Sequence, residues 1–290
     1  MIPAQVDYVR PADIGEALRI LQEREGEAKV LAGGYSLIPL LKLRLAQPGI
    51  LVDIAKLGMD GVTEDDDWLR IGARTTHRAF HEHPIVVDHY PMLRSVAGGI
   101  GDPQVRNWGT IGGSVAHADP AADWPAVLLA THAQVVVRGG DGERTIPARE
   151  FFLDTFTTAI APTEILTEVR IPRRRRRVGG GFAKLERKAG DFATVAACTT
   201  VQLAEDGSIA RAGIALTAVA ETPFAATDAE AVLIGQRPSE EAFRAAGAAA
   251  GAQSRPAADI RGPVEYKRAM AAEMVVRALR VATQRALAFG

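Results

Sequence analysis

The chain has 290 residues, of which 47% are hydrophobic, and its 34 basic and 35 acidic side chains nearly balance. This length favours two domains over one, and the balanced charge argues against attraction to nucleic acid or acidic membranes. The single cysteine, Cys198, excludes an internal disulfide framework and any iron–sulfur cluster held only by cysteines of this chain.

The first residues predict no signal peptide, because no charged stretch precedes an apolar one. With no apolar run long enough to span a bilayer, we expect a cytoplasmic protein. Strands are expected at 7–11, 29–31 and 50–54, with helices after the capping residue Asp13 and from Leu37. A turn at 32–36 follows the second strand. This order predicts a small parallel unit with the turn at the carboxyl end of a strand.

The next elements alternate short strands with short helices. Strands are expected at 68–72, 134–138 and 164–171. Helices are expected from Thr76 to His83, ended by Pro84, and over 92–97, ended by a glycine pair. Residues 101–107 predict a polar turn, and 124–131 an apolar helix.

A second glycine segment, 109–123, contains Gly112 and Gly113 and ends in Asp123. Paired glycines allow positive φ and leave room for a ligand, and successive amides in such a turn can hold an anion. Our hypothesis is that this segment and residues 32–36 close around one phosphate-bearing cofactor. Neither matches the dinucleotide fingerprint or the P-loop, which disfavours the usual nucleotide-binding folds.

The composition changes at five arginines, 173–177, and three glycines, 179–181, and we place a domain boundary there. A solvated linker is the favoured interpretation of the arginines, ahead of a docking face for an acidic partner subunit; a nucleic-acid patch is disfavoured. Strands are then expected at 182–185, 193–203 and 209–218, the last two joined by a hairpin at Asp206-Gly207. Three helices are expected near 225–235, 239–252 and 263–288.

Three histidines, His77, His81 and His83, are spaced so that two share a helix face, as metal ligands do. No glutamate follows in the H-E-x-x-H pattern, so an exposed polar helix end is favoured over a metal site. Cys198 lies in an apolar strand and is expected in the core. His117 lies inside the second glycine segment, where two roles stay open, a flavin neighbour or a residue that caps the turn.

The two glycine segments together resemble the flavin-binding segments of a known family. Residues 32–44 are similar to the first such segment of the FAD-binding medium subunit of molybdenum hydroxylases, as in carbon monoxide dehydrogenase and, more distantly, xanthine dehydrogenase. Residues 110–123 are similar to the second. Residues 101–107, 161–166, 182–193 and 259–268 also match in order, so the resemblance covers nearly the whole chain. Tyr35 and Ser114 depart from residues common in relatives.

The resemblance implies an α+β fold: a two-lobed FAD-binding domain of the vanillyl-alcohol oxidase/PCMH type at 1–177, with lobes at 1–56 and 57–177, followed by a small antiparallel sheet with helices at 178–290. Backbone amides of both segments and the Ser36 and Ser114 hydroxyls would hold the pyrophosphate. Asp123 would accept from ribose or adenine, and Lys184 would lie near the polar edge of the flavin. The full implied set of FAD-binding residues is Ala32, Gly33, Gly34, Tyr35, Ser36, Leu37, Ile100, Thr110, Ile111, Gly112, Gly113, Ser114, His117, Asp123, Leu166 and Lys184.

The implied function is electron transfer. A [2Fe–2S] small subunit would pass electrons to the FAD of this chain, and a molybdenum-cofactor large subunit would oxidise the substrate, in a dimer of heterotrimers. No catalytic or metal-binding residue is expected in this chain. Two alternatives remain, a self-sufficient flavin oxidase or reductase and a binding module that has lost FAD. The sequence specifies neither the substrate nor the electron acceptor.

Overall fold

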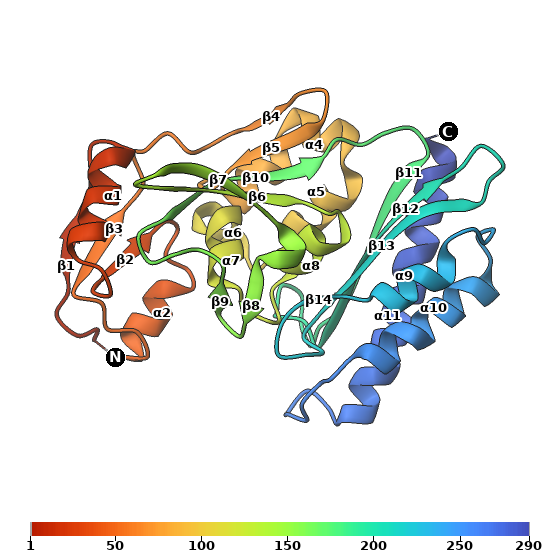
Figure 1. Cartoon of the computed structure of the whole chain (residues 1–290). Coiled ribbons are helices and arrows are strands. Elements are labelled where there is room, and N and C mark those ends of the chain that lie inside the picture. Colours follow the sequence, from red (N-terminus) through yellow and green to blue (C-terminus); the bar gives the residue numbers. More distant parts are fainter. Residues whose placement is uncertain (1, 290) are drawn as a thin grey trace.

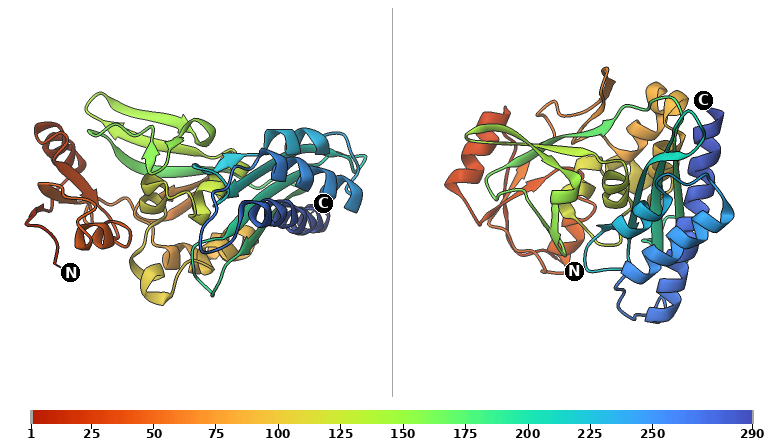
Figure 2. Two further views of the ribbon diagram at one scale, coloured as in Figure 1. Left: turned by 90° about the horizontal axis from the view of Figure 1, so that it is seen from below. Right: turned by 45° about the vertical axis from the view of Figure 1, so that its right-hand side comes forward.

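The computed structural model of the protein describes residues 2–289. In this range four β-sheets form, and the three larger ones define an N-terminal, a central and a C-terminal unit that follow one another across the molecule (Figure 1). The same succession is visible from below in Figure 2, where the N-terminal unit and the C-terminal helices lie at opposite ends. Helix and sheet are mixed throughout, as the sequence predicts.

The N-terminal unit is the parallel sheet expected from the strand–turn–helix–strand order. Its strands run in the order β1 (Asp7–Val9), β3 (Ile50–Asp53) and β2 (Ala28–Leu31), with the helices α1 (Ile14–Glu23) and α2 (Leu37–Lys42) in the connections. Asp13 caps α1, because its carboxylate accepts a hydrogen bond of 2.8 Å from the Glu16 amide. The turn at 32–36 therefore leaves the carboxyl end of β2.

The central unit is built on a five-stranded antiparallel sheet. Its middle strand, β10, comes from far along the chain and pairs with β5 on one side and β6 on the other. The strands in spatial order are β4 (Val62–Glu64), β5 (Trp68–Gly72), β10 (Ile165–Pro172), β6 (Gln134–Gly139) and β7 (Gly142–Pro147). The further elements are α3 (His77–Glu82), α4 (Pro84–His89), α5 (Pro91–Gly98), α6 (Pro103–Trp108), α7 (Ile111–His117), α8 (Asp123–Ala130), η1 (Ala148–Glu150), β8 (Phe152–Asp154) and β9 (Thr157–Thr158).

Two segments expected to be turns are helical. Residues 101–107 form α6, because Asp102 caps it through a 2.8 Å bond from the Val105 amide and Pro103 fills the first position. The glycine segment starts α7, which Thr110 caps. Pro84 likewise does more than end α3, since it occupies the first turn of α4. In each case a capping residue or a proline starts a helix.

The C-terminal unit is an antiparallel sheet covered on one face by helices. Its strands follow the order β11 (Val178–Leu185), β12 (Val195–Leu203), β13 (Ile209–Thr217) and β14 (Phe224–Ala225). The helices α9 (Thr227–Leu233), α10 (Glu240–Gln253) and α11 (Val264–Ala288) follow, and the long α11 lies along the sheet (Figure 1). The sheet and the three helices agree with the sequence prediction, apart from the short β14.

The glycine run 179–181 belongs to β11 and not to a linker. Gly179 and Gly181 face α11 so closely that a Cβ atom at either would overlap a backbone carbonyl oxygen, of Ala282 or Ala278. Gly180 faces the other way, and its Cβ position is 2.6 Å from the sulfur of Met92 in α5. Three glycines occur in succession because β11 packs closely against α11 on one face and against Met92 of α5 on the other.

The arginines at 173–177 are mostly engaged within the chain, which corrects the expectation of a solvated linker. Arg173 pairs with Glu64 at 2.9 Å, and Arg175 with Asp67 at 3.0 Å. The Arg174 guanidinium lies over the Phe289 ring, 3.3 Å from its centroid. These contacts connect the β4–β5 region and the C-terminal end of the chain to the segment between β10 and β11.

Helix α8 joins the central and C-terminal units. All eight of its residues are buried, as expected for a helix that is apolar on every side. The carbonyl oxygen of Ala130 accepts a 2.8 Å hydrogen bond from Thr200 on β12, and a Cβ atom at Gly213 on β13 would overlap the same oxygen. Among residues 2–289 no helix combines the length and apolar character needed to cross a membrane.

Candidate cofactor site

The two glycine segments meet in the structure, which confirms that they lie together. Gly33 packs against the backbone that leads into the second segment, and a Cβ atom there would overlap the carbonyl oxygen of Trp108. A Cβ atom at Gly113 would lie 4.0 Å from that of Ala32. Only glycine at position 33 allows the two backbones to approach so closely.

The turn at 32–36 presents open backbone amides. Within residues 2–289, the amides of Ala32, Gly33, Gly34, Tyr35 and Ser36 donate to no acceptor of the chain. Gly34 has φ +78°, a conformation that favours glycine. Successive free amides around a positive-φ residue form a concavity that binds anions. This turn therefore fits the pyrophosphate of FAD, the cofactor that the family resemblance implies.

Of the amides of residues 110–114, which were expected to face the phosphates, those of residues 111–114 are already used, and this corrects the expectation for them. All four amides that start α7 donate within the chain, at 2.9 to 3.0 Å. The bonds run from Ile111 to Thr75 O, from Gly112 to Ala73 O, from Gly113 to Thr110 Oγ1 and from Ser114 to Thr110 O. The helix start consumes the donors that a loop would have left open.

The side chains of Ser36 and Ser114 remain available near the two segments. In the described part of the chain neither hydroxyl makes a hydrogen bond, and both residues are half-buried. Tyr35 is exposed, with 41% of its surface accessible. The two serines can therefore still donate to a ligand, while Tyr35 lines the outer surface of the turn.

Asp123 and Lys184 form a buried ion pair between the central and C-terminal units. Lys184 Nζ lies 2.9 Å from Asp123 Oδ2, and only 4% of the Asp123 side chain is accessible. Burial raises the pKa of Asp123 to about 6, although the Lys184 ammonium acts in the opposite direction. The second oxygen, Oδ1, is buried and has no hydrogen-bond partner among residues 2–289. A buried carboxylate oxygen without a donor fits a ligand that carries hydroxyl or amino groups, as FAD does.

The apolar residues of the predicted set lie in or against the central core. Leu166 and Ile111 are buried in it, and Ile100 packs against it while remaining partly accessible. Leu37 is the first residue of α2, directly after the open turn. Their contact with a cofactor stays a prediction.

His117 lies at the end of α7, where its ring is 5.0 Å from the Phe156 ring. Burial lowers its pKa, and Lys29 acts in the same direction while Asp119 opposes it. These effects favour a neutral imidazole. Both roles named for His117, a flavin neighbour or a residue of the turn, stay predictions.

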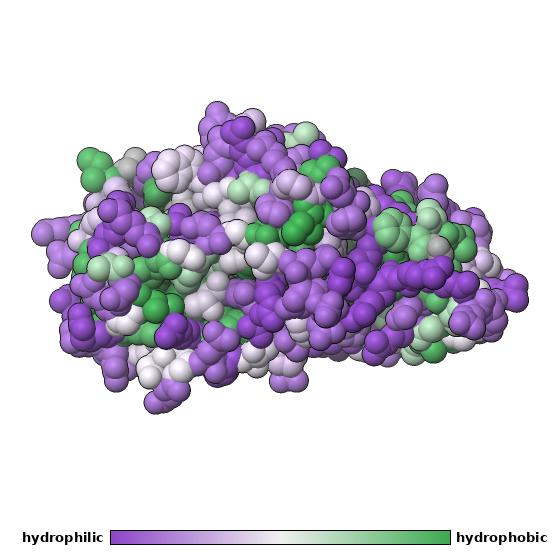
Figure 3. Space-filling view, turned by 90° about the horizontal axis from the view of Figure 1, so that it is seen from above, coloured by the Kyte–Doolittle hydropathy of each residue, from purple (hydrophilic) through white to green (hydrophobic). Residues whose placement is uncertain are grey.

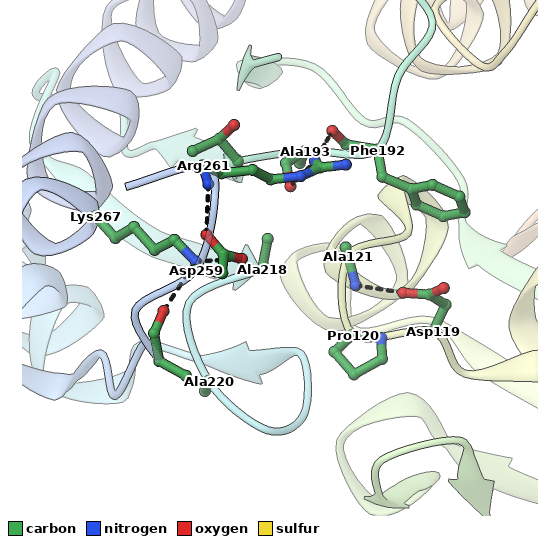
Figure 4. A pocket seen from close by; sticks show the side chains of 12 residues that line it. Asp119, Pro120, Ala121, Phe192, Ala193, Ala218, Ala220, Asp259, Arg261 and Lys267 are labelled. Carbon is green, nitrogen blue, oxygen red and sulfur yellow. Dashed lines mark hydrogen bonds and ion pairs between the residues drawn. The ribbon is translucent and has the colours of Figure 1, made fainter. Parts of the chain in front are cut away.

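A cavity of about 360 Å³ lies between the segment that precedes α8 and the C-terminal unit (Figure 4). One wall is formed by Asp119, Pro120 and Ala121, and the other by the segment 192–194 before β12 and by the loop before α11. Arg261 in that loop donates to the Ala193 carbonyl at 2.9 Å, and Lys267 pairs with Asp259 at 2.9 Å. None of the lining residues belongs to the predicted FAD-binding set, although several lie in the family-like segments 110–123, 182–193 and 259–268.

The three histidines make separate contacts in the part of the chain described. No group of three potential metal-ligating side chains occurs there. His77 is buried and accepts a 3.2 Å hydrogen bond at Nδ1 from Trp124 Nε1, so the expectation of an exposed helix end is wrong for this residue. Burial lowers its pKa to about 4. His81 instead contacts the Arg94 carbonyl at 2.9 Å, and Cys198 is buried, as predicted.

The molecular surface gives little sign of a large apolar docking area on the face seen from above. Hydrophilic residues cover most of that face, and hydrophobic areas are scattered over it (Figure 3). The features that could take part in binding a cofactor are the turn at 32–36 with its open amides, the buried Asp123–Lys184 pair and the cavity between the units.

Two family models match consecutive parts of the chain. Residues 4–174 match the FAD binding domain in molybdopterin dehydrogenase. Residues 181–282 match the CO dehydrogenase flavoprotein C-terminal domain. The first match ends two residues after β10 and the second begins within β11, so residues 175–180, which include three of the five arginines, lie between them.

The chain is similar to full-length relatives. It is 42% identical over 286 residues to the carbon monoxide dehydrogenase medium chain of Hydrogenophaga pseudoflava, covering 98% of this chain and 99% of that one. It is 37% identical to the 6-hydroxypseudooxynicotine dehydrogenase complex subunit alpha of Paenarthrobacter nicotinovorans, covering 99% and 97%.

Solved structures agree with the sequence matches. A chain of carbon monoxide dehydrogenase from Hydrogenophaga pseudoflava that lacks the Mo-pyranopterin moiety superimposes with a TM-score of 0.95 at 43% identity, covering 98% of this chain and 99% of that chain. A chain of quinoline 2-oxidoreductase from Pseudomonas putida 86 gives 0.92 at 30% identity, covering 99% and 100%.

Proposed function

Because the chain belongs to the family of FAD-binding medium subunits of molybdenum hydroxylases, we propose that it is the FAD-carrying electron-transfer subunit of such a complex. The resemblance seen in the sequence and the predicted α+β fold are thereby confirmed. The observation that supports the proposal most strongly is the open-amide turn at 32–36 beside the second glycine segment.

Three groups of this chain would hold FAD. The amides of the 32–36 turn would bind its pyrophosphate, with the Ser36 hydroxyl as a further donor. Asp123 Oδ1 would accept from a hydroxyl or amino group of the cofactor. Lys184 would place a positive charge near the polar edge of the ring. Bound FAD supplies the redox chemistry, and the chain supplies its orientation and electrostatics.

The names of relatives, a medium chain and a complex subunit among them, support partner subunits for this chain. One cysteine cannot hold a [2Fe–2S] cluster, so a small subunit would supply the clusters and a large subunit the molybdenum cofactor. Relatives of this chain carry the names of dehydrogenases or hydroxylases of different compounds, among them carbon monoxide, nicotine and glyceraldehyde. This variety supports a substrate site outside the medium subunit. A dimer of heterotrimers and a cytoplasmic location stay predictions.

We assign the FAD-binding domain to 1–177, with lobes at 1–56 and 57–177, and the C-terminal domain to 178–290. The matches over 4–174 and 181–282 support a boundary in the segment between them. The separate sheets β1-β3-β2 and β4-β5-β10-β6-β7 support the division into lobes.

Absorbance spectroscopy tests the proposal on the purified full chain. We expect one bound FAD per chain and no substrate turnover without partner subunits. Gly33→Ala should weaken FAD affinity by at least about tenfold, because the new methyl group forces the turn away from Trp108. Gly140→Ala is the control, since nothing lies within 4 Å of a Cβ atom there.

A visible spectrum that stays featureless after incubation with FAD would contradict the cofactor assignment. Rapid substrate oxidation by the isolated chain would contradict the subunit assignment and support the self-sufficient flavoenzyme. Circular dichroism of Gly33→Ala separates lost affinity from lost folding.

A further inference from the structure

Lys184 serves two carboxylates in one buried site. Its ammonium lies 2.9 Å from Asp123 Oδ2 and 3.3 Å from Glu186 Oε2. The accessible fractions of these side chains are 11% for Lys184, 4% for Asp123 and 27% for Glu186. With both carboxyls ionised, the cluster carries two negative charges and one positive charge.

The fold explains why Glu186 reaches this cluster. Residues of β11 alternate between two cores: Ala183 and Leu185 pack with the C-terminal helices, whereas Phe182 packs with the central core. Lys184 and Glu186 share the parity of Phe182, and so they point to the central unit where α8 begins with Asp123. Glu186 follows the last residue of β11 directly.

Glu186 acts on Lys184 mainly through charge. Its Oε2 is buried without a hydrogen-bond partner in the described chain, although it lies at ion-pair distance from the ammonium. Asp123, in contrast, accepts a hydrogen bond from Lys184. The ammonium is therefore hydrogen-bonded to one carboxylate and electrostatically offset by the other.

We propose that Glu186 is a positioning residue that holds and partly neutralises the Lys184 ammonium, and that it thereby lowers the reduction potential of FAD bound at this site. The inference rests on the proposed function, which places Lys184 beside the flavin. Reduction adds negative charge to the cofactor, so a nearby positive charge favours the reduced form. The Glu186 carboxylate offsets part of the Lys184 charge, and so it reduces the stabilisation of the reduced cofactor by that charge.

The pKa of Asp123 shows, in the chain without cofactor, whether Glu186 shares the Lys184 ammonium. The charged groups that act on it are Lys184, which lowers its pKa, and Glu186, which raises it, in addition to burial. Removal of the Glu186 charge therefore leaves Lys184 to Asp123 alone, and the pKa of Asp123 should fall.

The experiment compares Glu186→Gln with Glu205→Gln in the full chain. Glu205 is exposed in the turn between β12 and β13, at the opposite end of β12 from the cluster, and loses the same charge. A redox titration of the FAD-loaded chain should show the oxidised-to-reduced ratio shifted toward reduction by on the order of tenfold in Glu186→Gln, about 30 mV for a two-electron couple. Glu205→Gln should match the unmodified chain.

The carboxyl carbon resonance of Asp123 in the FAD-free chain gives the second readout, with a lower pKa expected only in Glu186→Gln. An unchanged pKa of Asp123 in Glu186→Gln would overturn the claim that Glu186 shares the Lys184 ammonium with Asp123. A lower pKa with FAD bound at an unchanged potential would overturn the effect on the cofactor and leave the proposed function standing. A chain that binds no FAD would overturn the proposed function, and this inference with it.

Discussion

Burial raises the pKa of the Asp123 carboxyl, although two other effects favour its ionised form. Asp123 occupies the first position of α8, where the helix dipole favours a negative charge, and it pairs with Lys184. Loss of solvation outweighs both and raises its pKa to about 6. At the residue scale, the site therefore contains a carboxyl group whose pKa lies well above its ordinary value.

The raised pKa predicts a pH dependence of stability. Between the ordinary value of 3.8 and about 6, the folded chain binds more protons at Asp123 than the unfolded chain does. The free energy of unfolding therefore falls as pH rises through this window, by about 3 kcal/mol from this group. Asp123→Asn should remove that part of the slope.

Urea unfolding of the FAD-free chain at pH 4.5 and pH 7 measures this slope. Asp141→Asn, in an exposed turn, is the control and should keep the slope of the unmodified chain. Equal slopes in Asp123→Asn and the control would show that Asp123 is not buried as described.

At the element scale, β11 shows how the packing of neighbours selects residues. It is covered by α11 on one face and reached by α5 on the other, and its glycines stand where those neighbours come closest. At the end of the strand, Phe182 packs against the central core and Leu185 against the C-terminal core. Lys184 between them forms the buried ion pair with Asp123. One strand thus supports both the packing of α11 and the position of Lys184.

Gly181→Ala tests the packing of β11 on α11. The added methyl group would overlap the carbonyl oxygen of Ala278, which is backbone and cannot move without shifting the helix. We expect the free energy of unfolding to fall by about 1–3 kcal/mol or more in a denaturant titration. Gly140→Ala, which has open space at its Cβ position, should change it little; a similar loss in both variants would argue against the close contact.

At the scale of the whole molecule, two features join the units. Helix α8 is buried where the central and C-terminal units meet. The arginines at 173–177, which lie in the segment that connects these units, contact Glu64 in the central unit and Phe289 near the end of the C-terminal unit. The site lies at this junction, since Asp123 begins α8 and Lys184 belongs to β11. Relative movement of the units would therefore disturb the ion pair.

Arg174→Ala tests the junction. The variant loses the contact with the Phe289 ring and a 3.0 Å hydrogen bond to the His89 carbonyl, so we expect the free energy of unfolding to fall by about 1–3 kcal/mol. Arg176→Ala is the matched control, because within residues 2–289 Arg176 is exposed and makes no ion pair or hydrogen bond. Thermal unfolding of both variants, followed by calorimetry, gives the comparison; equal midpoints would show that the Arg174 contacts contribute nothing.

Local signals in the sequence were sufficient for most elements. The capping pair at Asp13, the apolar run of α8 and the Asp206-Gly207 turn act over a few residues, and the corresponding elements form where they were expected. The prediction that the two glycine segments lie together is also confirmed; it was drawn from their shared glycine pattern, and the family resemblance agreed with it.

The tertiary structure alone decided the properties that depend on residues far apart in sequence. Whether the α7 amides are open depends on acceptors in Ala73 and Thr75, and whether β11 needs glycine depends on α11. The burial of His77, the pairing of the arginines and the shared Lys184 ammonium likewise require neighbours that no local pattern names. Hydrogen-bond donors, close contacts and buried charges are properties of pairs, and the chain brings those pairs together only when it folds.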